Sequence, residues 1–276
     1  MRFTLNMHRA LTWVSSSAIV AMLLLLLASA PTNVKADVID VHAPRQDAAF
    51  ESGALCPPDM VYIPPGRAQL GAAVSAAQFG PSSPPNPPHW GVFGGFCIER
   101  VEVSAKSYKA CSSCSRKGTP DASVCQLGPD RLPIQCISQV ESEQYCAFFG
   151  RRLPTSDEWE YAARGTDGRM YPWGNAKPQV AHLWAFHEVG TDPHDVSPFG
   201  VADMGGNVGE WVSDRAMHFM VSTQCGVVRG DVSSEAIPHW PSSVVFTQIG
   251  CDVGVPRPFV GFQCAKEIVR QQPIDG

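Results

Sequence analysis

Ten cysteines restrict the fold of this chain more than any other feature of its sequence. An even number of cysteines in a chain bound for an oxidising compartment indicates disulfide bonds. Counting does not give the pairing, because ten cysteines allow about 945 complete sets of pairs. We therefore expect a globular domain held by disulfides, with cysteines at positions 56, 97, 111, 114, 125, 136, 146, 225, 251 and 264.

The N-terminus indicates the compartment. Arg2 and Arg9 precede an apolar run that ends in five leucines at 23–27, which is the layout of a signal peptide. Small residues suited to cleavage lie at Ala30 and Ala36, and the second site is favoured because proline follows the first. No cysteine lies near either site, so no lipid anchor is expected. We predict a signal peptide at 1–36 and an extracytoplasmic protein, periplasmic or secreted.

The alternative for this segment is an uncleaved membrane anchor. The apolar run is shorter than the roughly 20 residues that a spanning helix needs. We therefore expect no stable membrane insertion once the signal peptide has been removed.

The remainder of the chain has room for one large domain. About 240 residues remain after cleavage, enough to bury close to three quarters of the unfolded surface. We divide them into a flexible lead-in at 37–55, the domain at 56–268 and a tail at 269–276. Charged residues make up 17% of the chain and the net charge is −5, without the basic stripe that nucleic acid requires, so no nucleic-acid partner is expected.

Local patterns predict few regular elements. Residues 60–63 form a short strand, and residues 96–103 alternate apolar and charged side chains as in a half-buried strand. Ser104 is expected to cap a helix that carries Cys111 and Cys114 and stops near Gly118. This pattern favours the α+β class.

Two helices have clearer boundaries. Ser138 with Glu141, and Thr155 with Glu158, have the spacing of capping boxes. Gly150 and Gly165 follow as helix stops, and beyond them residues 171–264 contain only short strands and turns.

Cys111 and Cys114 have the spacing of half a zinc site. No second Cys-x-x-Cys pair and no His-x3-His pair completes it, so zinc is not favoured. Their proximity favours a local disulfide among Cys111, Cys114 and Cys125.

Five characteristic segments follow one another along the chain. They are MVYIPPG at 60–66, GRRLPTSDEWEYAARG at 150–165, YPWG at 171–174, GVADMGGNVGEW at 200–211 and GFQCA at 261–265. Together they resemble the formylglycine-generating enzyme family, the sulfatase-modifying factors, over residues 56–268. The resemblance implies a compact fold, related to C-type lectin-like domains and poor in regular secondary structure. It also implies a disulfide between Cys146 and Cys264.

Enzymes of the family that this chain resembles use copper(I), held by two cysteine thiolates, to oxidise a substrate cysteine to formylglycine with dioxygen. Soft thiolates suit Cu(I). The resemblance places both cysteines a few residues after an Arg-Gly-Gly-Ser motif. The corresponding segment here begins with Arg229, Gly230, Asp231 and Val232.

No cysteine stands in that segment. Cys225 precedes it and Cys251 follows about twenty residues later, so neither has the short spacing, and a disulfide is the favoured use of one or both. We expect a degenerate motif, no catalytic residue and no copper.

The resemblance also implies a structural calcium ion in the loop 203–210. Its ligands would be the side chain of Asp203, the carbonyls of Gly206 and Val208, and the carboxylate of Glu210. Oxygen ligands supplied alternately by side chain and backbone suit Ca²⁺. The alternative is a metal-free loop with Glu210 in a salt bridge. A second calcium site of the family is not favoured, because His182 stands where asparagine is expected.

A cluster of histidines and acids offers another metal site. Its members fit no helix face, so a solvated loop is the favoured interpretation of His182, His187, Glu188, Asp192, His194 and Asp195.

Our leading hypothesis is an exported, non-catalytic member of the resembled family that binds a protein, peptide or glycan. The alternative is a working formylglycine-generating oxidase that acts on a sulfatase cysteine. A structural envelope component is the third class. Resemblance supports the fold more strongly than any of these functions.

Overall fold

The computed structural model describes residues 56–71, 86–114, 128–176, 186–217, 224–230, 249–252 and 254–268. The chain divides into two units, Met1–Pro44 and Arg45–Gly276, and every described residue lies in the second. The predicted signal peptide, lead-in and tail lie outside the described residues. Within the described part, no helix has the length and apolar character needed to cross a bilayer.

Three short helices and nine short strands make up the described part, which confirms the α+β class. The helices are α4 (Ala105–Lys109), α5 (Gln139–Phe148) and α6 (Ser156–Arg164). The strands are β1 (Met60–Ile63), β2 (Gly66–Leu70), β3 (His89–Phe93), β4 (Phe96–Glu99), β5 (Gly209–Met217), β6 (Gln224–Arg229), β7 (Ile249–Asp252), β8 (Val260–Gly261) and β9 (Ala265–Glu267).

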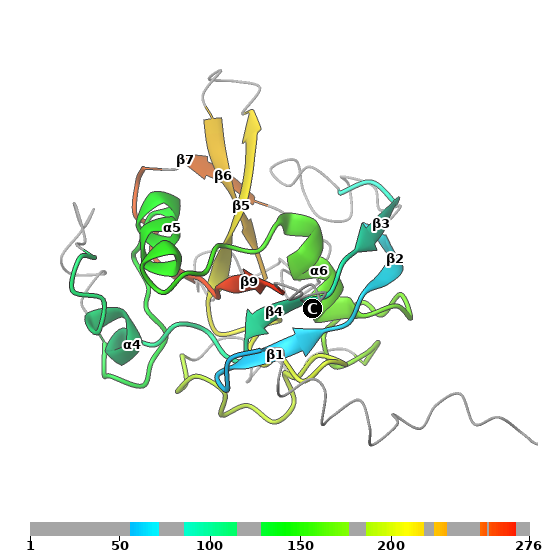
Figure 1. Ribbon diagram of the computed structural model, residues 1–276, viewed down its shortest axis with the longest axis horizontal. Helices are drawn as coiled ribbons and strands as arrows, with labels where there is room; N and C mark the ends of the chain where they lie inside the picture. Colours follow the sequence, from blue (N-terminus) through cyan, green and yellow to red (C-terminus); the bar gives the residue numbers. More distant parts are fainter. Residues whose placement is uncertain are drawn as a thin grey trace, which may run out of the picture. The chain divides into compact units, whose positions relative to one another are not determined.

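The strands form three small sheets, with orders β1-β4-β9, β2-β3 and β7-β6-β5-β8 (Figure 1). All pairs are antiparallel except β5 with β8. The first sheet joins strands from the two ends of the described chain, because β4 pairs with β1 on one side and with β9 on the other.

The helix caps follow the sequence closely. Both predicted capping boxes form. The Ser138 and Thr155 hydroxyls accept the backbone N–H groups of Glu141 and Glu158, and the carboxylates of these glutamates accept the backbone N–H groups of Ser138 and Thr155. Gly165 ends α6 with a φ of +68°, a conformation that glycine adopts without strain.

The helix after Ser104 is shorter than predicted. Ser104 caps it, but α4 ends at Lys109, so Cys111 and Cys114 follow the helix instead of lying on it. The backbone tightens after Lys109: the Ala110 N–H donates to the Ser107 carbonyl, and a disulfide closes the next turn.

The predicted half-buried strand at 96–103 is wrong in length and in exposure. β4 ends at Glu99 and all four of its residues are buried. Phe96 and Ile98 pack in the apolar core, while Cys97 forms a disulfide with Cys56 and Glu99 pairs with Arg151. Glu99 accepts the Cys264 N–H at 2.7 Å and pairs with Arg151, so its carboxyl group has partners inside the protein.

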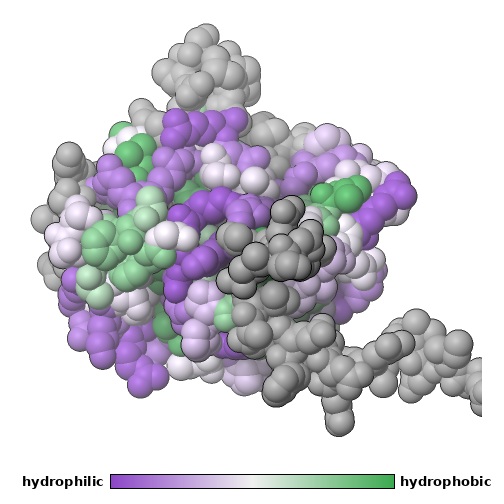
Figure 2. Space-filling model, in the orientation of Figure 1, coloured by the Kyte–Doolittle hydropathy of each residue, from purple (hydrophilic) through white to green (hydrophobic). Residues whose placement is uncertain are grey.

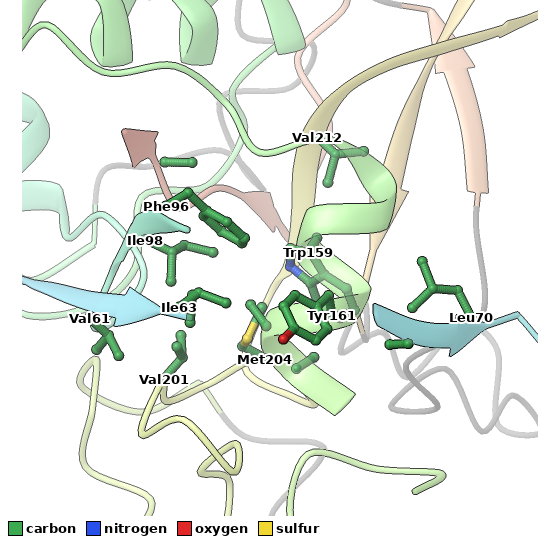
Figure 3. Close-up of a cluster of buried hydrophobic side chains, with 14 of the residues drawn as sticks. Val61, Ile63, Leu70, Phe96, Ile98, Trp159, Tyr161, Val201, Met204 and Val212 are labelled. Atoms are coloured by element: carbon green, nitrogen blue, oxygen red, sulfur yellow. The ribbon is translucent and has the colours of Figure 1, made fainter. Parts of the chain in front are cut away.

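A cluster of apolar side chains around Trp159 of α6 forms one core (Figure 3). Ile63, Phe96 and Ile98 reach it from the β1-β4-β9 sheet, and α6 also contacts β2, β5 and β6. Phe93 of β3 stacks on Tyr161 with ring centroids 4.3 Å apart. Helix α6 therefore joins all three sheets.

The disulfides agree with the prediction in most respects. Cys146–Cys264 is confirmed, Cys111–Cys114 is the local bond, and Cys56–Cys97 is a third. Cys136 is also disulfide-bonded.

The disulfide predicted for one or both of Cys225 and Cys251 does not include Cys225, which is free and buried. Its register partner on β7 is Asp252.

Candidate functional site

Two buried carboxylates of the loop 203–210 mark the candidate site. Asp203 and Glu210 are 0% and 1% exposed, and both were predicted as calcium ligands. Asp203 has a φ of +63° and Asn207 a φ of +64°, so the loop turns sharply twice between them. These turns bring the strand entry at Glu210 back toward Asp203.

Each of these carboxylates has one satisfied oxygen and one orphaned oxygen. Asp203 Oδ2 accepts the Gly190 N–H, and Glu210 Oε2 accepts the Trp159 indole N–H. Asp203 Oδ1 and Glu210 Oε1 are buried without a hydrogen-bond partner. An unsatisfied buried carboxylate oxygen is costly, so these two atoms are where a cation would stabilise the loop.

Burial sets the electrostatics of the site. Desolvation raises the pKa of Asp203 to about 6, against the opposing effect of the Gly190 N–H and of His187. Desolvation also raises the pKa of Glu210 well above its ordinary value, and the charges of Asp203 and Asp195 raise it further. A divalent cation would lower both pKa values, because it favours the ionised carboxylates.

The donor set fits Ca²⁺ only if backbone carbonyls contribute. Among the described residues, no three acidic, histidine or cysteine side chains converge as a metal site. The predicted set has two carboxylates and the carbonyls of Gly206 and Val208, all of them oxygens of the kind that calcium takes. The predicted alternative, a salt bridge at Glu210, does not match the contact with Trp159.

Sequence reasoning missed two further acids of this region. Glu102 is 1% exposed and accepts the Val208 N–H at 3.1 Å and the Asn207 amide at 2.6 Å. It was assigned to the charged face of a strand that does not extend so far.

Asp195 is buried too and accepts the Gly205 N–H, so the solvated loop expected around it is wrong at this position. Burial raises its pKa to about 8. His182 lies outside the described residues. The acidic residues between Glu188 and Asp195 were visible in the sequence, but no local pattern showed which of them would be buried.

The structure describes the first two residues of the segment predicted to be a degenerate motif. Arg229 is fully buried at the end of β6, and its Nη2 lies 2.6 Å from Glu160 Oε2. Gly230 follows with a φ of +75°, while Asp231 and Val232 lie outside the described residues.

Glu160 is the centre of this buried polar cluster. Its carboxylate also accepts the Gly71 N–H at 2.7 Å, the Asn86 amide at 3.0 Å and the Arg164 guanidinium at 2.9 Å. The motif arginine thus connects β6 to α6, to the end of β2 and to the approach to β3.

The thiols do not fit a copper(I) site at the family spacing. The sequence has no cysteine between Cys225 and Cys251, and Cys225 is the free cysteine of the described part. Two adjacent thiolates are therefore not available near Arg229 within this spacing.

The fold and the site define the class: an α+β domain, cross-linked from its middle to its end, with a buried acidic loop and no cysteine between Cys225 and Cys251. The family model described as "Sulfatase-modifying factor enzyme 1-like domain" matches residues 46–268, and the chain belongs to this family.

Curated relatives include active and inactive forms. The chain is 33% identical to mouse "Inactive C-alpha-formylglycine-generating enzyme 2" over 161 residues, which are 50% of each chain. It is 36% identical to mouse "Formylglycine-generating enzyme" over 115 residues, which are 34% of this chain and 30% of the relative. The chain thus spans half or less of these relatives.

A solved structure supports the fold alone. The "Structure of PvdO from Pseudomonas aeruginosa" aligns with a TM-score of 0.57 at 23% identity, and the match covers 75% of this chain and 94% of that one.

Proposed function

We propose that this chain is an exported, non-catalytic member of the sulfatase-modifying factor family that binds an acidic peptide segment of a partner. The single observation that carries the non-catalytic assignment is the missing thiolate pair after Arg229. The mouse relative named inactive supports it. The relative named as an active enzyme keeps the oxidase as the alternative.

The buried position of Arg229 supports the same proposal. Its guanidinium faces Glu160 and lies over the Trp159 ring, 5.3 Å from the ring centroid. Removal of either partner would leave an uncompensated buried charge, so Arg229 has a structural role that does not require catalysis.

Anaerobic Cu(I) titration of the mature, disulfide-bonded protein tests the non-catalytic assignment. We expect no tight binding and no conversion of a Cys-x-Pro-x-Arg peptide when dioxygen is admitted, beside an active family member as the positive control. Tight binding with conversion of the peptide would establish the oxidase instead.

The binding role rests on the β2–β3 outer face, defined as Arg67, Gln69, Trp90 and Val92. Trp90 is 58% exposed and Val92 is 80% exposed, whereas alternate residues of β2 are buried. Figure 2 shows a hydrophobic area on this side of the molecule within a hydrophilic surface. Exposed aromatic and aliphatic groups beside an arginine are typical of binding surfaces.

The positive charge of Arg67 favours an anionic ligand on this face. The Arg67 guanidinium lies over Trp90, 4.0 Å from the ring centroid, and Arg67 is exposed, so a ligand can reach its N–H groups. No described carboxylate pairs with Arg67, and Asp157 pairs with His89 at 3.1 Å. A carboxylate ligand with an apolar neighbour matches Arg67 and Val92.

A peptide fits this face better than a glycan. Sugars stack on open aromatic faces, and Arg67 already covers one face of Trp90. An acidic peptide uses the free edge of the guanidinium and the exposed valine together.

Binding of a library of Asp- and Glu-containing peptides, followed by fluorescence polarisation, tests this surface. Trp90→Ala and Arg67→Gln should each weaken binding at least tenfold. Val255→Ala, at an exposed valine that is 46% accessible elsewhere, should leave it unchanged. Equal binding by all variants would exclude the face, and binding of acidic oligosaccharides alone would replace the peptide by a glycan.

We also propose that the loop 203–210 binds a structural calcium ion through the two orphaned oxygens and the Gly206 and Val208 carbonyls. Calcium bound only by the native state should raise the melting temperature, and EGTA should lower it. Asp203→Asn should remove the calcium-dependent shift, whereas Asp130→Asn, at an exposed acid, should keep it. An EGTA-insensitive melting temperature in the native protein would exclude the ion.

A further inference from the structure

The Cys111–Cys114 disulfide differs from the other described disulfides in the loop that it closes. Its sequence separation is 3, against 41 for Cys56–Cys97 and 118 for Cys146–Cys264. Because the chain entropy that a cross-link removes grows with the length of the loop, this bond contributes least to the stability of the fold.

The turn that this disulfide closes is also held without it. The Cys111 N–H donates to the Tyr108 carbonyl at 3.1 Å, and the Cys114 N–H donates to the Cys111 carbonyl at 3.3 Å. Tyr108 itself is buried and stacks on Tyr145 of α5. Opening the S–S bond therefore leaves the backbone and its anchor in place.

The two sulfurs have unequal environments. Cys111 is 4% exposed within the core cluster of Tyr108 and Tyr145, whereas Cys114 is partly exposed at its margin. An external thiolate reaches Cys114 first, which makes Cys111 the leaving group.

The surroundings can accept a thiolate at Cys111. The Ser113 hydroxyl lies 3.8 Å from Cys111 Sγ and can donate a hydrogen bond to it. The carbonyls that end α4 oppose a negative sulfur. Of the two lysines in its last turn, Lys109 pairs with Asp130 at 2.7 Å, and Lys106 supplies the positive charge that offsets these carbonyls.

We propose that Cys111–Cys114 is a thiol-exchange site that accepts two electrons from a pair of cysteine thiols on a partner polypeptide. A partner thiolate attacks Cys114 Sγ, the Cys111–Cys114 bond breaks, and Cys111 Sγ leaves with the electron pair. The second partner thiolate then attacks the partner sulfur of the mixed disulfide and releases Cys114. The partner dithiol becomes a disulfide, and its two protons go to Cys111 and Cys114.

This exchange is independent of copper, of calcium and of the β2–β3 outer face. It uses two thiols that the sequence places at the spacing Cys-Ser-Ser-Cys, where either can resolve a mixed disulfide formed on the other. The partner is recognised by its chemistry alone, as an accessible dithiol.

Anaerobic titration of the mature protein with glutathione buffers, followed by alkylation and peptide mass spectrometry, tests the first requirement. We expect Cys111 and Cys114 to become alkylated at a thiol concentration at least tenfold below that needed for Cys146 and Cys264, with unchanged near-ultraviolet circular dichroism. A bond that opens only together with Cys146–Cys264, or only when the fold is lost, is purely structural and overturns the proposal.

Two single variants test the direction of attack. Cys111→Ala leaves the accessible sulfur and should form a mixed disulfide with oxidised glutathione at least tenfold faster than Cys114→Ala, which leaves the buried one. Equal rates would contradict the assigned leaving group.

A reduced peptide with two cysteines tests the electron transfer itself. The native protein should oxidise one peptide dithiol for each Cys111–Cys114 pair reduced, and the Cys111→Ala/Cys114→Ala double variant should oxidise none. Equal oxidation by the double variant would exclude this site.

Discussion

Two buried charged clusters show how single residues in this protein serve the fold. Arg229 and Glu160 are each fully buried, and they belong to a cluster that also holds Arg164. Glu99 lies between Arg151 and the Cys264 N–H. A buried charge without its counter-charge is very costly. Substitution of one partner in these clusters should therefore lower the free energy of unfolding more than substitution of one partner in a surface pair.

Glu160→Gln removes the carboxylate charge that faces both arginines while it keeps the shape of the side chain. We expect a loss of about 3 kcal/mol in the free energy of unfolding, measured with urea. Glu143→Gln, at a pair with Arg215 that is about a third exposed, should cost less than about 1 kcal/mol. Similar losses for both variants would remove the structural explanation for the retention of Arg229.

Glu99 should give the protein a measurable pH dependence. Burial raises its pKa from 4.5 to about 7, although the Cys264 N–H and Arg151 oppose the shift and Asp59 adds to it. Because the folded pKa lies above the unfolded value, the stability from this group is complete below pH 4.5 and is lost as the pH rises through 7.

Urea unfolding of the native protein and of Glu99→Gln between pH 4 and 8 tests this expectation. The stability of the native protein relative to the variant should fall on the order of 3 kcal/mol across the window and then level off. A difference that grows with pH would mean that Arg151 dominates and that the pKa is lowered.

At the scale of elements, α6 is the part of the fold on which most others depend. It contacts β2, β5 and β6, and its Trp159 lies in the core cluster (Figure 3). A nine-residue helix is marginal in isolation, so the capping box at Thr155 and Glu158 fixes where it begins.

Thr155→Ala removes the hydroxyl that accepts the Glu158 N–H at 3.1 Å. We expect a loss of about 1 kcal/mol in the free energy of unfolding. Thr155→Ser keeps the acceptor and should retain most of the stability, so a comparable loss in both variants would show that the cap is not the cause.

The predictable elements were those with local signals. Capping boxes predicted α5 and α6, because the bonds join residues three apart. β4 was mispredicted because Glu99 and Glu102 are hydrogen-bonded or paired with Cys264, Arg151 and Val208, all distant in sequence.

The candidate site shows the same difference between local and distant signals. Asp203 and Glu210 could be predicted from a recognisable motif, whereas the burial of Glu102 and Asp195 depends on tertiary packing.

At the scale of the whole molecule, the Cys146–Cys264 bond ties α5 to the segment before β9 across 118 residues. A cross-link of this span removes much of the freedom of the unfolded chain, because loop-closure entropy grows with length. The sequence could suggest this pair only through the family resemblance.

Cys146→Ala/Cys264→Ala should lower the free energy of unfolding by roughly 4 to 5 kcal/mol, as the chain-entropy model predicts for a loop of this length. Cys111→Ala/Cys114→Ala should cost about 2 kcal/mol or less, because its loop is short. Urea unfolding of both double variants under oxidising conditions measures the difference, and equal losses would refute the loop-length explanation.

The order β1-β4-β9 has a consequence for biogenesis. The central strand of this sheet has one neighbour from the start of the domain and another from its end (Figure 1). Strands so far apart in the sequence pair slowly, because the chain loses the entropy of closing a long loop before the contact between the strands stabilises the sheet. A chain that emerges N-terminus first cannot complete this sheet until residue 267 has appeared, so it needs protection from aggregation throughout its emergence.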